Sequence, residues 1–124
     1  MNNFKSNRNI KLMKQVLLTY KLRKKLKKKF GLTLDNYLVL AYIDEYKNNV
    51  GRYYMRDIIS YIGIDQSRVV KSVKELVKKD YLNKGRDPQD TRNVILIVSS
   101  AQHDFIENIL KYINENKIDL DDGI

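Results

Sequence analysis

The sequence of 124 residues predicts a mainly α-helical fold with a small β element. Apolar residues recur at helical spacing in five separate stretches, whereas residues 93–98, NVILIV, are rich in the β-branched residues typical of strands. A chain of this length fits one domain. We therefore expect a flexible N-terminus over residues 1–7, a single folded domain over 8–116 and an acidic flexible tail over 117–124.

The formal net charge is +9, and it is unevenly distributed. Residues 1–30 carry eleven Lys or Arg and no acid, whereas residues 100–124 carry six acids and two bases. This asymmetry favours a polyanionic partner, with nucleic acid first and an anionic membrane surface second. No apolar run approaches the roughly 18 residues of a membrane span, and the basic N-terminus lacks the apolar block of a secretory signal. We expect a cytoplasmic protein with no membrane partner.

Several classes of chemistry are not supported by the residue types. The chain has no cysteine, which excludes disulfides, thiolate metal sites and thiol redox sensing. Its single histidine, His103, is expected to be exposed in the first turn of the last helix. There is no glycine-rich phosphate loop and no Ser/His/Asp set in a recognised spacing. We therefore expect no enzyme, no catalytic residue, no metal and no cofactor.

The N-terminal region predicts a long helix from about Arg8 to Lys29. Its apolar positions are Leu12, Met13, Val16, Leu17, Tyr20, Leu22 and Leu26. Two interpretations fit this pattern. The helix packs on a second copy of the chain with its lysines outside, or it lies as a basic amphipathic helix on a membrane or in a partner groove. The lysines of residues 23–29 are expected to add non-specific attraction to phosphates.

The next region predicts the centre of the core. Gly31 is expected to end the first helix, and Thr33 to cap a second one from Leu34 to Lys47 that has little polar surface. A turn over residues 48–51 precedes a short strand, Arg52 to Met55. A two-turn helix, Arg56 to Ile62, then leads to Gly63.

The stretch Ile64 to Tyr81 predicts an amphipathic helix that Asp65 caps. Its apolar side holds Val69, Val70, Val73, Leu76 and Val77. Its polar side holds Ser67, Arg68, Lys71, Ser72, Lys74, Glu75 and Lys78. A short helix, a glycine-bearing turn and this longer helix fit a helix-turn-helix whose second helix enters a DNA major groove. The alternative is an ordinary amphipathic surface helix.

The region after this helix predicts two strands around a charged loop. Leu82 to Lys84 and Asn93 to Val98 are the strands, and residues 85–90 form a turn-rich loop. After a helix-turn-helix, such a hairpin makes a wing, with Arg86 and Arg92 at its edges near a minor groove. Asp90 is placed to hold the Arg92 guanidinium. The alternative is a plain hairpin with scattered charges.

A last helix, about Ala101 to Asn116, is expected after a cap at Ser99 or Ser100. Its apolar residues are Phe105, Ile106, Ile109, Leu110, Tyr112 and Ile113, which is more than one stripe. We expect this surface to pack on the first helix, on a second subunit, or on both.

The chain resembles the SarA-type staphylococcal accessory regulators, which are winged-helix proteins related to the MarR group. The strings that carry the resemblance are KKFGLTLDNYLVLAYI, YYMRDIISYI, SRVVKSVKELVKKDYL and GRDPQDTRNVILIV, and it covers about residues 12–113. The resemblance implies a winged helix-turn-helix whose terminal helices form a homodimer. It places the family's wing arginines on Arg86 and Arg92 and its wing aspartate on Asp90. The acid that often follows that aspartate in the family is Thr91 here.

The resulting hypothesis is a dimeric, sequence-preferring regulator that binds double-stranded A·T-rich promoter DNA. The expected DNA-binding residues are Gln66, Ser67, Arg68, Lys71, Ser72, Lys74, Arg86, Asp90 and Arg92. The alternative is a non-specific architectural protein or an RNA-binding module, which the same charge would serve. The residues locate no pocket for a small-molecule ligand of the kind that MarR relatives bind, so that partner is left open.

Overall fold

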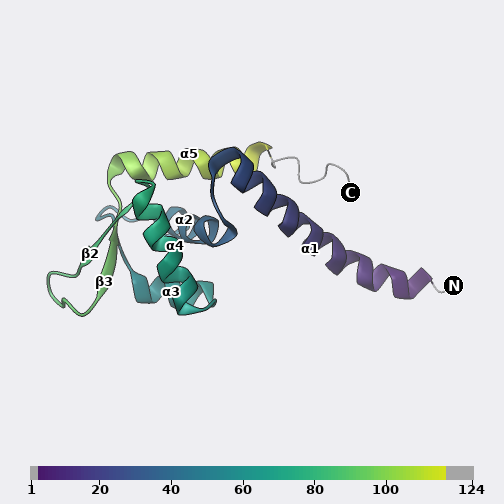
Figure 1. Cartoon of the computed structure of the whole chain (residues 1–124), viewed down its shortest axis with the longest axis horizontal. Helices are drawn as coiled ribbons and strands as arrows, with labels where there is room; N and C mark the ends of the chain where they lie inside the picture. The colour runs from purple at the N-terminus through teal and green to yellow at the C-terminus, as the bar shows by residue number, and fades with distance from the viewer. Residues whose placement is uncertain (1–2, 117–124) are drawn as a thin grey trace.

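The computed structural model describes residues 3–116 and the side chains of residues 8–115, so the predicted acidic tail over 117–124 lies outside the described residues. The fold in this range is mainly α-helical with one small sheet, as predicted (Figure 1). In chain order its elements are α1 (Asn3–Phe30), α2 (Leu34–Glu45), β1 (Arg52–Tyr54), α3 (Met55–Ile62), α4 (Gln66–Lys78), β2 (Asn83–Arg86), β3 (Val94–Ile97) and α5 (Ser100–Asn116).

Three predicted boundaries differ from the structure in ways that matter for the site. Helix α4 (Gln66–Lys78) is shorter than the predicted stretch Ile64 to Tyr81 and ends three residues earlier. Helix α1 begins at Asn3 rather than near Arg8. Strand β2 continues through Gly85 and Arg86, because these residues pair with Ile95 and Val94 of β3. The wing loop is therefore shorter at its first edge than predicted, and Arg86 belongs to a strand.

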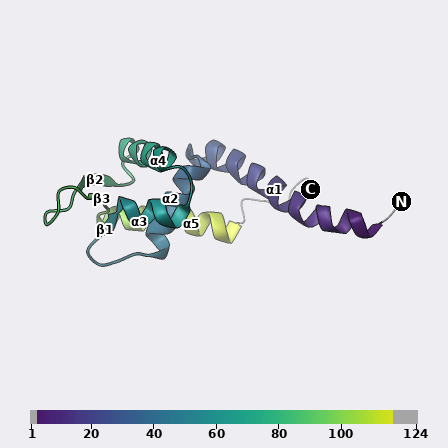
Figure 2. The same cartoon turned by 90° about the horizontal axis from the view of Figure 1, so that it is seen from below.

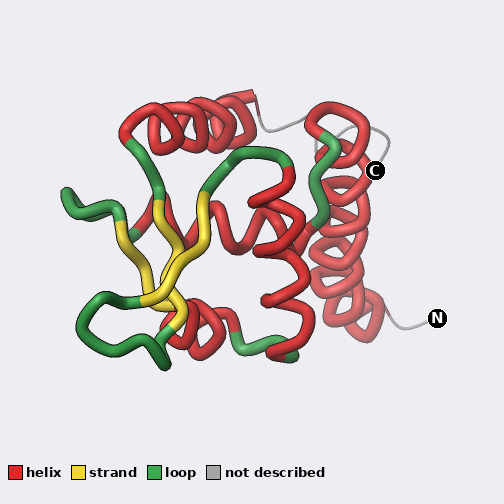
Figure 3. The backbone as a smooth tube through the Cα atoms, turned by 60° about the vertical axis from the view of Figure 1, so that its left-hand side comes forward, coloured by secondary structure: helices red, strands yellow, loops and turns green. Residues whose placement is uncertain are grey.

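The sheet has the order β1-β3-β2 with both pairs antiparallel (Figure 3). Its central strand β3 contributes the buried Ile95 and Leu96, and β1 contributes the buried Tyr53. Helix α2 packs against α4 and α5 and supplies Val39 and Leu40 to the core. The predicted central position of this helix is thus confirmed by its burial.

Helix α1 joins the core only through its C-terminal part. Leu26 is fully buried, and the Phe30 ring lies 5.7 Å from the Tyr112 ring in an edge-to-face arrangement. The N-terminal part projects away from the other elements (Figures 1 and 2). In the single chain this part exposes a set of large apolar side chains. They are Ile10, Leu12, Met13, Val16, Leu17 and Tyr20.

Helix caps explain why several elements begin where they do. The Thr33 hydroxyl accepts from the Asn36 amide, and the Asn36 side chain accepts from the Thr33 amide, so α2 starts with a capping box. Ser99 and Gln102 make the same reciprocal pair at α5. The prediction that the Asp65 carboxylate caps α4 is wrong. Asp65 occupies the cap position, but its side chain makes no capping bond and only its backbone carbonyl accepts from the first turn.

The prediction that His103 is exposed is also wrong. Its side chain is buried, and its Nε2 atom lies 2.8 Å from the Tyr53 hydroxyl oxygen. The Tyr53 hydroxyl also accepts from the Asn48 amide, so it joins His103 to the turn before β1. The reason is tertiary, because β1 brings Tyr53 beside the start of α5.

Candidate nucleic-acid interface

Helices α3 and α4 form a helix-turn-helix around Gly63 and Asp65. The apolar side of α4 is buried at Val69, Val73 and Leu76, where the helix packs against α2. The side chains on its opposite side are exposed, and these are Gln66, Ser67, Arg68, Lys71 and Lys74. The predicted separation of apolar and polar faces is therefore present, and five of the six predicted α4 site residues share the exposed face.

Ser72 is the exception among the predicted site residues. It is only 1% exposed, and its hydroxyl accepts a hydrogen bond of 2.8 Å from the Asn36 side chain of α2. The prediction that Ser72 faces DNA is wrong, because a side chain buried between two helices cannot reach a base or phosphate. The spacing gives the signal that was missed, since Ser72 lies three residues after Val69 and four before Leu76 on the buried stripe.

Arg68 is held by a residue from another helix. Its Nε and Nη2 atoms donate to the two carboxylate oxygens of Asp35 in α2, at 3.1 and 2.8 Å. The Asp35 carboxylate raises the pKa of Arg68 through these bonds and its charge. Asp35 was not among the predicted site residues, because nothing local connects positions 33 residues apart.

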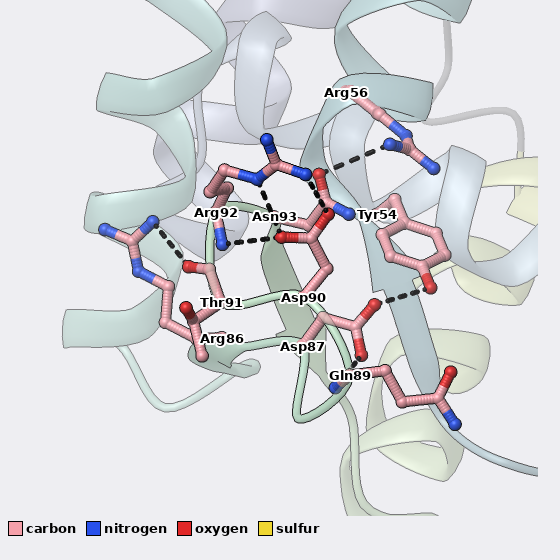
Figure 4. A network of polar contacts seen from close by, with 9 residues as sticks. All are labelled: Tyr54, Arg56, Arg86, Asp87, Gln89, Asp90, Thr91, Arg92 and Asn93. Atoms are coloured by element: carbon pink, nitrogen blue, oxygen red, sulfur yellow. Dashed lines mark hydrogen bonds and ion pairs between the residues drawn. The ribbon is translucent and has the colours of Figure 1, made fainter.

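The wing carries a second pair of the same kind (Figure 4). Arg92 donates from Nε and Nη2 to the Asp90 carboxylate at 3.0 and 3.1 Å, as the sequence predicted. These bonds hold the pKa of Asp90 below its usual range. The Arg92 side chain is nevertheless 90% exposed, so its remaining donors face solvent. Arg86, at the other edge of the wing, donates to the Thr91 carbonyl at 3.4 Å.

The base of the wing is tied to β1 and α3. The Tyr54 hydroxyl donates to Asp87 at 2.9 Å, and Arg56 of α3 donates to the Asn93 side chain at 3.2 Å (Figure 4). The Arg56 guanidinium also lies 4.7 Å from the centre of the Tyr54 ring, within the range of a cation–π contact. These contacts fix the wing relative to the helix-turn-helix.

Arg56 is a functional candidate that sequence reasoning missed. It lies with Gln66 of α4 and Arg92 of the wing along a groove of about 340 Å³ between the three elements. The only available signal was its place in YYMRDIISYI, one residue after a predicted strand. The groove brings two arginines that are 36 residues apart in the sequence to one surface.

Other kinds of site are not apparent in the described chain. None of the helices within this range combines the length and apolar character that crossing a membrane requires. Among the same residues, no three acidic or histidine side chains are grouped in a way that could hold a metal ion.

An exposed second helix beside a tethered wing defines the winged helix-turn-helix class. Solved structures of regulators have the same fold. The MarR family regulator AbsC from Streptomyces coelicolor aligns over 98% of this chain and 81% of its own with a TM-score of 0.74 at 17% identity. MarR from E. coli aligns over 94% of this chain and 82% of its own with a TM-score of 0.72 at 14% identity. At these identities the likeness concerns the fold.

The chain belongs to the transcriptional regulator SarA/Rot family, whose model matches residues 21–109. It is 70% identical to the HTH-type transcriptional regulator SarT of Staphylococcus aureus strain MSSA476, over 94% of this chain and 99% of that protein. It is 36% identical to the transcriptional regulator SarA of Staphylococcus aureus strain Newman, over 90% and 88%. The protein is therefore a transcriptional regulator of the SarA/Rot family and not an enzyme, which confirms the resemblance to the SarA-type regulators. Its fold is like that of MarR regulators.

Proposed function

We propose that a homodimer of this protein binds promoter DNA in a sequence-preferring manner, with α4 in the major groove and the wing toward the minor groove. The observation that carries this proposal is one continuous surface that joins the exposed face of α4, the groove beside it and the 90% exposed Arg92. A helix with a buried apolar side and exposed donors in its first turns has the shape and chemistry for base edges.

Within α4 we assign base or phosphate contacts to the exposed side chains. Arg68 and Gln66 have the forked donor and acceptor groups that pair with guanine and adenine edges. Ser67, Lys71 and Lys74 suit nearby bases and phosphates, because phosphate contacts fix the position of a protein on the duplex. Ser72 is not assigned a contact, since it is buried.

The wing is assigned to the minor groove. Narrow A·T-rich grooves carry a strong negative potential that attracts arginine, which supports Arg86 and Arg92 as the contacting residues and A·T-rich DNA as the target. Asp90 acts by orienting Arg92. Arg56 lies where the wing meets α3, so we assign it a phosphate between the two grooves.

Two fold neighbours support DNA binding by analogy. Sco3205, a MarR family regulator from Streptomyces coelicolor, is described in complex with DNA, and AbfR is described as bound to DNA in its reduced form. They align with this chain at TM-scores of 0.73 and 0.65, with 20% and 21% identity.

Because the proposed target is chromosomal DNA, we also place this protein in the cytoplasm.

The homodimer is proposed from helix α1. A row of apolar side chains lies on its projecting half, and each is between 41% and 63% exposed. These side chains are Ile10, Leu12, Met13, Val16, Leu17 and Tyr20. A continuous apolar face of this kind favours pairing with a second copy. A two-fold pair would present two α4 helices to neighbouring major grooves.

Selection of bound duplexes from a random pool tests the proposal. We expect enrichment of a common A·T-rich site, and tighter binding to it than to a scrambled duplex of the same length and composition. Affinity for both should fall steeply with salt, because Lys and Arg displace counterions from phosphates. Equal affinity for the selected duplex, the scrambled duplex and heparin would instead support the architectural alternative.

A further inference from the structure

The Asp35–Arg68 pair has the same geometry as the Asp90–Arg92 pair of the wing. In both, the carboxylate occupies the side edge of the guanidinium formed by Nε and Nη2, at distances between 2.8 and 3.1 Å. The end edge, with one proton of Nη1 and one of Nη2, is left for another acceptor. The fixed fork therefore points one defined edge away from the protein.

The carboxylate of this pair is held in place from two directions. Asp35 lies in the first turn of α2, where the helix dipole favours a negative charge. The next residue, Asn36, is buried and donates to the Ser72 hydroxyl and to Glu75 of α4, which fixes α2 against α4 at this point. The Asp35 side chain is 23% exposed, whereas that of Arg68 is 56% exposed.

We propose that Asp35 is a specificity-determining positioning residue for DNA recognition by Arg68. This inference rests on the proposed function. The carboxylate orients the free edge of the guanidinium toward a base and places a negative charge beside it, so a phosphate at the same position is disfavoured. Asp35 itself touches no DNA and acts through Arg68.

The orientation of the Arg68 guanidinium and the negative charge of Asp35 have different consequences in specific and in non-specific complexes. At a selected site, Arg68 meets acceptors that its end edge matches, and the fixed orientation lowers the entropy lost on binding. On unrelated DNA, Arg68 contacts phosphates, and the Asp35 charge opposes that contact. Loss of the carboxylate should therefore strengthen non-specific binding without strengthening specific binding.

The test compares Asp35→Asn, Arg68→Ala and the double variant with the full-length wild type by fluorescence anisotropy. The probes are the duplex that wild type selects from a random pool and its scrambled counterpart. We expect D35N to bind the scrambled duplex on the order of threefold more tightly and to lose discrimination by at least that factor. In the R68A background, D35N should leave the ratio of the two affinities unchanged. Asp104→Asn in α5 is the matched control, because it removes the same charge far from Arg68.

The outcomes separate this inference from the function on which it rests. If wild type discriminates between the duplexes and D35N keeps the same ratio, the role of Asp35 is overturned and the proposed function stands. An equal loss of discrimination in D104N, or in the R68A background, also overturns it, since the effect would then be one of net charge or folding. If wild type itself shows no preference, both proposals fall.

Discussion

Two arginines on the proposed DNA-binding surface each share a pair of hydrogen bonds with an aspartate. For Arg92 the partner is two residues away, and for Arg68 it lies on another helix. Both pairs are solvent-exposed, so they contribute little to the stability of the fold. Their effect is instead to fix the direction of a guanidinium before DNA arrives.

At this scale, Arg92→Ala should weaken binding to the selected duplex by about tenfold, because a well-placed arginine accounts for at least that much discrimination. The melting temperature should not change, since the side chain is 90% exposed. Arg92→Lys is the matched variant, and it should restore only part of the affinity because an ammonium cannot form the fork. An electrophoretic mobility shift titration measures this, and unchanged affinity in R92A would remove the wing from the interface.

His103 predicts a pH dependence of stability. Burial, with a contribution from Lys47, lowers the pKa of His103 from its usual value, so the folded protein favours the neutral ring that is hydrogen-bonded to Tyr53. The contribution of neutral His103 to the free energy of unfolding is complete above the unfolded pKa of about 6.5. It is lost as the pH falls through the lower pKa of the folded protein. The free energy of unfolding should therefore decrease less between pH 7.5 and 5.5 in His103→Phe than in wild type.

Urea unfolding at several pH values measures this effect. Near pH 7.5, His103→Phe should lose about 1–3 kcal/mol in the free energy of unfolding, because the buried Tyr53 hydroxyl loses its hydrogen-bond partner on α5. Tyr53→Phe is the control, since it removes the hydrogen bond but keeps the buried titrating ring and thus the steeper pH dependence. An identical pH dependence in H103F and wild type would show that His103 does not titrate between the two states.

At the scale of the elements, two glycines that precede or follow an element adopt the left-handed backbone conformation, but their surroundings differ. Gly51 before β1 has φ +71°, and a Cβ added there would lie 2.4 Å from the Val98 carbonyl oxygen. Gly63 after α3 has φ +72°, but such a Cβ would meet nothing within 4 Å. The first turn therefore needs glycine for space and conformation, and the second for conformation alone.

The matched variants Gly51→Ala and Gly63→Ala should reflect this difference. We expect G63A to lower the free energy of unfolding by about 1 kcal/mol, the cost of a left-handed conformation with a Cβ. G51A should cost more, because either β1 or β3 must shift to relieve the contact. Chemical denaturation measures both losses. Equal losses would mean that the chain near Val98 adjusts without strain.

At the scale of the whole molecule, the projecting half of α1 predicts assembly. Leu17→Glu should convert a dimer into a monomer, because it places a charge in the middle of the apolar face. Binding to the selected duplex should weaken at least tenfold, since a monomer engages only one half-site.

Light scattering over a range of protein concentrations gives the mass, and Lys14→Glu in the same helix serves as the charged control that should remain dimeric. A wild type that is monomeric at micromolar concentrations, or an L17E variant that stays dimeric, would exclude this helix as the interface. The salt dependence of binding should be similar for wild type and L17E per bound chain, because the lysines and arginines are unchanged.

Most elements and most of the exposed side chains of the candidate site could be predicted from the sequence. The valine and leucine spacing of α4, the Thr33 cap and the Asp90–Arg92 pair all depend on residues at most a few positions apart. Such patterns are set by helix geometry and local hydrogen bonding, which are the same in any fold. Ser72 shows the limit, because its polar type suggested exposure although its spacing placed it on the buried stripe.

Amino-acid order alone determined which segments are helical, where the wing lies and which face of α4 is polar. Only the tertiary structure decided that Asp35 holds Arg68, that Arg56 joins Asn93 and that His103 is buried against Tyr53. These pairs are 33, 37 and 50 residues apart. The physical reason is that a hydrogen bond depends on ångström distances between side chains, and for distant residues those distances are fixed only when the helices and strands pack together.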